Sequence, residues 1–83
     1  MDISKEQFAY IFSWWLAGVF GEKFLREWPT KEKIDYMIDE YNTVDYDLDL
    51  DIPRDVFVFA WMCYLNNNGF LTPELEAEFE NLM

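Results

Sequence analysis

The segment RDVFVFAWMCYL, residues 54 to 65, constrains the fold more than any other part of the sequence. No residue from Val56 to Leu65 carries a charge, and the segment is apolar on nearly every side when it is built as a helix. A helix that is hydrophobic all round has to be buried, so other elements must surround it. We therefore expect this helix at the centre of a single globular domain that comprises residues 1–83, a length that suits one core.

Three further helices are expected around this central helix. The first begins at the capping box SKEQ, residues 4 to 7, and runs towards Pro29, with a kink or break between Gly18 and Gly21. The second is KEKIDYMIDEYN, residues 31 to 42, with Thr30 as its N-cap. Asn68-Gly69 ends the central helix, and Thr72-Pro73 begins the last one, ELEAEFENLM. The predicted fold class is mainly α, a small four-helix domain.

The first helix has more apolar residues than one buried face needs. Two apolar sides can be distinguished by helical spacing: Phe8, Phe12, Trp15 and Val19 on one, and Tyr10, Trp14 and Ala17 on the other. We expect both sides to be covered, and Phe24, Leu25 and Trp28 to continue the apolar pattern. The apolar run from 8 to 20 is shorter than the roughly 20 residues that span a bilayer.

Between the second and third helices the sequence TVDYDLDLDIP alternates with a period of two, which is the period of a strand. Apolar residues share one parity, and four aspartates, Asp45, Asp47, Asp49 and Asp51, share the other. A short extended acidic segment over about 44–52 is therefore expected. The mutual repulsion of the four aspartates sums to only roughly 1 kcal/mol, which a fold can tolerate. A solvent-exposed edge of this segment, without any binding role, would therefore explain the row of aspartates adequately.

The charge of the whole chain is strongly negative. There are 17 acidic residues against 6 basic ones, for a net charge of −11. Direct binding of nucleic acid is excluded, because that binding depends on Lys and Arg at the phosphates, and an anionic membrane surface is disfavoured for the same reason. The single cysteine, Cys63, cannot form an internal disulfide, which favours a reducing compartment, the cytoplasm (that of the host cell if the protein is viral).

The residues needed for most catalytic and metal chemistry are missing. Without histidine there is no Ser-His or Cys-His nucleophile, and the three glycines form no phosphate-binding loop. DYDLDLD begins like a calcium loop, but Leu50 and Val56 stand where that loop needs Gly and Glu. We expect no enzyme activity, no cofactor and no bound metal.

Acidic residues are concentrated in two regions, around residues 35–55 and in the last helix, and tyrosines lie among the first group. Like-charge pairs four residues apart weaken the last helix slightly, which favours a role for these acids in binding rather than in stability. In the first region, tyrosine among carboxylates is typical of a protein interface. The candidate partner-binding residues are Asp35, Tyr36, Asp39, Glu40, Tyr41, Asp45, Tyr46, Asp47, Asp49, Asp51, Glu74, Glu76, Glu78 and Glu80.

Carboxylates spaced several Å apart resemble a row of phosphates, and this predicts an inhibitor that binds the basic nucleic-acid-binding surface of a DNA- or RNA-handling protein. Such a nucleic-acid mimic is similar in size, charge and architecture to the small acidic decoys of bacteriophages, including anti-CRISPR and anti-restriction proteins. No stretch of the chain matches a particular family's motif. The partner would be a basic nuclease, CRISPR effector, repair or transcription protein.

Two other classes of protein are also compatible with these sequence features. A bacteriocin-type immunity protein is also small, acidic and often four-helical, and would bind its nuclease through KIDYMIDEYN, residues 33 to 42. A non-enzymatic assembly or adaptor protein, including a homodimer paired through residues 44–52, is the third class. Antiparallel pairing of that segment would bring two aspartate rows together, which is unfavourable.

Overall fold

A computed structural model describes residues 4–43 and 52–83 of the chain. The described residues form the helices α1 (Lys5–Leu25), α2 (Lys31–Thr43), α3 (Arg54–Asn67) and α4 (Pro73–Leu82), with no strand among them. The predicted mainly α, four-helix fold is confirmed. The expected extended acidic segment, apart from Ile52, lies outside the described residues.

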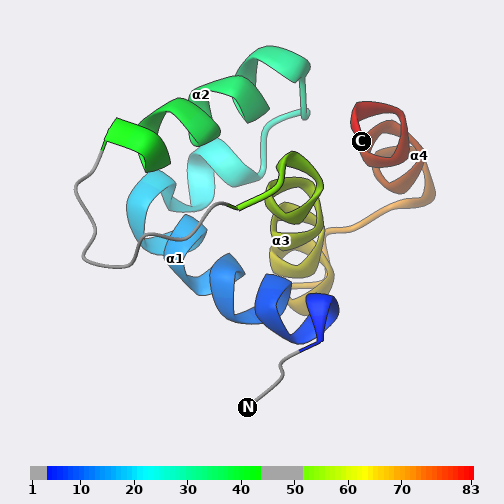
Figure 1. Ribbon diagram of the computed structural model, residues 1–83. Coiled ribbons are helices and arrows are strands. Elements are labelled where there is room, and N and C mark those ends of the chain that lie inside the picture. The colour runs from blue at the N-terminus through cyan, green and yellow to red at the C-terminus, as the bar shows by residue number, and fades with distance from the viewer. Residues whose placement is uncertain (1–3, 44–51) are drawn as a thin grey trace.

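Helix α3 occupies the centre of the fold, as its composition predicted. It contacts α1, α2 and α4, and Figure 1 shows α2 and α4 apart from each other, on different sides of α3. Six of its residues are buried, including Phe57 and Trp61. None of the described helices combines the length and the apolar character needed to cross a membrane.

The helix ends lie where local sequence signals placed them. Ser4 accepts a hydrogen bond from the backbone N–H of Gln7 at 3.1 Å, and the Gln7 side chain accepts one from the Ser4 N–H, which completes the capping box. The hydroxyl of Thr30 accepts from the Lys33 N–H, and that of Thr72 caps α4 in the same way. Four orphan N–H groups begin every helix, and these hydroxyls satisfy one of them in each case.

Helix α3 ends in a motif that requires glycine. Gly69 has φ +75°, its N–H donates to the carbonyl of Asn66, and the Phe70 N–H donates to the carbonyl of Leu65 at 2.8 Å. These two bonds define a Schellman motif. At its other end, Pro53 is the N-cap of α3 rather than part of its first turn, and no side chain caps that end.

Helix α1 breaks at Gly21. This residue has φ +85° and ψ 161°, values that are not helical, and the helix changes direction there (Figure 1). The break brings Leu25, which is fully buried, against α3: the indole N–H of Trp61 donates to the Leu25 carbonyl at 2.7 Å. Trp28, expected to continue the apolar pattern, is instead 52% exposed.

The core is built mainly from α1 and α3, with aromatic rings packed edge to face. Phe12 of α1 contacts Phe57 of α3 with ring centres 5.1 Å apart, and Trp61 contacts Phe79 of α4 at 5.3 Å. The largest fully buried side chains are Trp61, Phe57, Phe79, Leu16, Leu25, Ile34, Met37, Leu65 and Val58.

The second apolar side of α1 is not covered by the described residues, contrary to expectation. Tyr10 is 46% exposed and Trp14 66%, and Val19, which the spacing places on the side with Phe12, is also about half exposed. The reason lies in the packing: α3 takes up the side of α1 that carries Phe12 and Leu16. Cys63 of α3 is only partly buried, and that burial raises the pKa of its thiol.

Candidate functional site: acidic helices and an aromatic groove

The first group of candidate residues lies on α2. Asp35 is exposed and forms an ion pair with Arg54 of α3. The hydrogen bond from the Arg54 guanidinium holds the pKa of Asp35 below its usual range, and the charges of Arg54 and Lys31 act in the same direction. Asp35 therefore connects α2 to α3 and already has a cationic partner within the chain.

The remaining acids of α2 are differently placed. Asp39 is exposed, and Glu40 is half-buried. Neither forms an ion pair with a base in the described ranges 4–43 and 52–83. These two carboxylates are open to an external cation.

The two tyrosines of α2 have different surroundings. Tyr36 is 50% exposed, and its ring rests on Phe20 and Phe24 of α1, with centres 5.8 and 6.0 Å away. Tyr41 is half-buried and packs edge to face against Phe12 and Trp15 of α1 and against Phe57 of α3. Tyr36 is thus the tyrosine of α2 available to a partner, while Tyr41 is part of the core packing.

The second group lies on α4. Glu74, Glu76 and Glu80 are exposed and Glu78 is half-buried. Phe79 is the buried residue of α4 and packs against Trp61 of α3. The four glutamates lie on both sides of the helix face that carries Phe79. Among the described residues, no base is paired with any of these four acids.

The remaining candidates, Asp45, Tyr46, Asp47, Asp49 and Asp51, lie outside the described residues. The described acids of α2 and α4 do not form one continuous row, because the two helices are apart in the fold (Figure 1). The acidic surface therefore consists of at least two separate groups.

A groove between α1 and α3 was not predicted from the sequence. Its α1 wall consists of Tyr10, Ser13, Trp14 and Ala17. Its α3 wall consists of Tyr64, Asn67 and Asn68. The groove has a volume of about 370 Å³, comparable to ligand pockets in proteins. The surplus of aromatic residues in α1 was the available signal, since one small core could not cover all of them.

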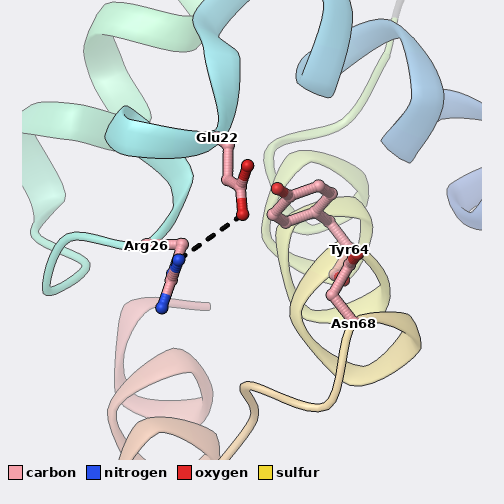
Figure 2. Close-up of polar contacts among 4 residues, drawn as sticks. All are labelled: Glu22, Arg26, Tyr64 and Asn68. Carbon is pink, nitrogen blue, oxygen red and sulfur yellow. Dashed lines mark hydrogen bonds and ion pairs between the residues drawn. The ribbon is translucent and has the colours of Figure 1, made fainter.

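Charged residues lie close to Tyr64, one of the residues that line this groove. Figure 2 shows the Tyr64 ring of α3 with its hydroxyl turned towards Glu22 of α1, and Asn68, the C-cap of α3, four residues further along the chain. Burial raises the pKa of Tyr64, and the negative charge of Glu22 raises it further, while Arg26 acts in the opposite direction. Arg26 lies 3.5 Å from Glu22 and places its guanidinium over the ring of Phe70.

No metal centre is indicated in the ranges 4–43 and 52–83, where no group of three or more His, Cys, Asp or Glu side chains is placed to hold an ion. Comparison with protein-family models, with curated proteins and with solved structures finds no match to this chain.

Proposed function

We propose that this protein is a small acidic inhibitor that binds the basic nucleic-acid-binding surface of a DNA- or RNA-handling protein. It would act as a nucleic-acid mimic, in the manner of phage proteins that block CRISPR or restriction systems. The observation that carries the proposal is the imbalance of charge, 17 acids against 6 bases. Self-repulsion of this size costs stability, so a partner that benefits from the charge would account for it.

The arrangement of the bases supports the proposal. Lys5 is paired with Asp55, Arg26 with Glu22 and Arg54 with Asp35. Three of the six bases thus have an acidic partner within the chain, and none of these ion pairs involves an acid of α4. A carboxylate surface on packed helices can steer a basic protein towards it and suppress the wrong partners.

Capture of a partner, followed by competition with nucleic acid, tests the proposal. The tagged protein is incubated with lysate of the host cell at low and high salt, and the captured protein is identified and purified. We expect a nucleic-acid-binding protein that is released by salt, and we expect its DNA or RNA to be displaced by this protein. The purified protein alone should not retard a DNA probe at physiological salt.

Two charge variants assign the surface. Asp45, Asp47, Asp49 and Asp51 are replaced together by Asn in one variant, and Glu74, Glu76, Glu78 and Glu80 by Gln in the other. Each keeps the side-chain shape, so a lower association rate and a flatter salt dependence would locate the contact. A ternary complex in which nucleic acid stays bound would contradict the mimic and favour the immunity-type protein. Unchanged binding by both variants would exclude these two groups of acids and leave Asp35, Asp39 and Glu40 of α2 as the remaining acidic contact.

A further inference from the structure

The groove between α1 and α3 brings three aromatic rings to one exposed site. Tyr10 and Trp14 are perpendicular, with an interplanar angle of 74° and ring centres 6.4 Å apart. Tyr64 belongs to the opposite wall. Trp14, two-thirds exposed, is the most exposed large apolar side chain within residues 4–43 and 52–83. An exposed indole that a second aromatic ring already orients is a typical anchor position in interfaces.

The chemistry of the groove selects a cation. Aromatic faces attract a guanidinium or ammonium group electrostatically, and the side-chain oxygens of Asn67 and Asn68 can accept hydrogen bonds from it. No lysine or arginine lines the groove, and the nearest charges, Glu22 and Arg26 beside Tyr64, are paired with each other. The groove lining therefore offers no cation to an anionic or acidic segment.

The chain itself places a guanidinium on an aromatic ring elsewhere. Arg26 lies over the ring of Phe70 at 4.0 Å from its centre. A second copy of the chain is a poor occupant of the groove, because each copy has a charge of −11 and the two would repel each other. Charge complementarity favours a basic protein instead.

We propose that the groove between α1 and α3 is a binding site for an arginine side chain of the basic partner protein. The planar guanidinium would stack on Trp14, with its N–H groups directed to the side-chain oxygens of Asn67 and Asn68. The source of this arginine is the partner of the proposed function, on which this inference rests. The groove would then anchor the complex, while the acidic helices steer it.

A short peptide tests the site without the partner. The probe is Ac-Gly-Gly-Arg-Gly-Gly-amide, titrated into the full-length, ¹⁵N-labelled protein at physiological salt and followed by NMR. We expect the Trp14 indole N–H and the side-chain amides of Asn67 and Asn68 to shift. The same peptide with citrulline, a neutral analogue of similar shape, should not produce these shifts.

Matched variants separate the groove from general electrostatic attraction. Trp14→Leu keeps an apolar side chain and should weaken binding of the peptide by roughly three- to thirtyfold, the range expected for a lost cation–π contact. Trp28→Leu removes another half-exposed tryptophan, outside the groove, and should leave binding unchanged. Both sites are exposed enough for the fold to survive, which the NMR spectrum verifies directly.

Three results would overturn the proposal. Equal shifts with the citrulline peptide would make the groove an apolar slot rather than a cation site. Shifts confined to the acids of α2 and α4 would show that arginine is attracted only by general charge. Trp14 shifts that depend on protein concentration alone would show that a second copy covers the groove. The peptide titration does not require the partner protein, so the two proposals can fail separately. If the peptide binds in the groove but this protein does not displace nucleic acid from the captured partner, the proposed function is refuted and the assignment of the groove stands.

Discussion

The indole N–H of Trp61 donates a hydrogen bond to the carbonyl oxygen of Leu25 across 2.7 Å, in the buried centre of the fold. Leu25 is the last residue of α1, where helix carbonyls have no partner within the helix. This contact therefore satisfies an orphan carbonyl and joins the end of α1 to the middle of α3. It also explains why a tryptophan, with a polar group on a large ring, is tolerated in full burial.

Trp61→Phe should be strongly destabilising. The substitution leaves the Leu25 carbonyl buried and unpaired, which costs about 1–3 kcal/mol, and it leaves a void that adds to the loss. Urea unfolding followed by circular dichroism measures the change. Trp28→Phe is the matched control, and because Trp28 is half exposed it should change stability by less than about 0.5 kcal/mol. Similar losses in the two variants would refute a structural role for the Trp61 bond.

Two glycines of α1 should respond in opposite directions to alanine. A Cβ at Gly18 or at Gly21 would have free space around it, with nothing within 4 Å, so the difference lies in the backbone alone. Gly21, at φ +85°, has a conformation that alanine adopts only with strain, and Gly21→Ala should cost about 1–3 kcal/mol. Gly18→Ala should stabilise the helix by up to about 1 kcal/mol.

Thermal unfolding of both glycine variants checks this pair. A neutral Gly21→Ala substitution would show that α1 can continue as one straight helix through this position. In that case the contact between Leu25 and Trp61 would not depend on the break.

The helix ends of this fold were predictable because their signals are local. Ser4, Thr30, Thr72 and Gly69 each act within a few residues of their own position, so the sequence is enough to place them. The central position of α3 was predictable for a different reason, since no other placement buries its apolar surface.

The exposed face of α1 could not be predicted by the same means. The side with Phe12 and the side with Trp14 are both apolar, and the choice between them depends on how α3 crosses α1. The groove is a consequence of that choice. The pairing of Asp35 with Arg54 likewise joins residues 19 positions apart on two helices, which periodicity within one helix cannot predict.

The Asp35–Arg54 pair makes a prediction about pH. Because the pKa of Asp35 is lowered in the folded protein, its ionised form contributes stability that is present above the unfolded pKa, about 3.9, and is lost as the pH falls through the folded value. Arg54→Gln should raise the pKa of Asp35 towards its ordinary value. An NMR titration of the Asp35 carboxyl carbon between pH 7 and pH 2 measures the shift directly.

The control for that titration is Lys31→Gln. Lys31 acts on Asp35 only through charge and is the weakest of the contributions, so the pKa of Asp35 should rise less than it does in Arg54→Gln. Identical titration curves for wild type and Arg54→Gln would contradict the ion pair in solution.

The last prediction concerns the acids of α4, where stability and the proposed function make opposite demands. Glu76 and Glu80 are four residues apart with like charges, and Glu80 lies near the negative end of the helix dipole. Glu80→Lys turns the pair into an attractive one and suits the dipole, so stability should rise by about 0.5–1 kcal/mol at low ionic strength and by less at high salt. Glu80→Gln, which only removes the repulsion, should give a smaller gain. Thermal unfolding at two salt concentrations measures both effects.

If α4 contacts a basic partner, Glu80→Lys should also slow association with that partner while the melting temperature rises. A stabilised variant with an unchanged association rate would remove α4 from the binding surface and leave the acids of α2 and the row from Asp45 to Asp51 to carry the interaction.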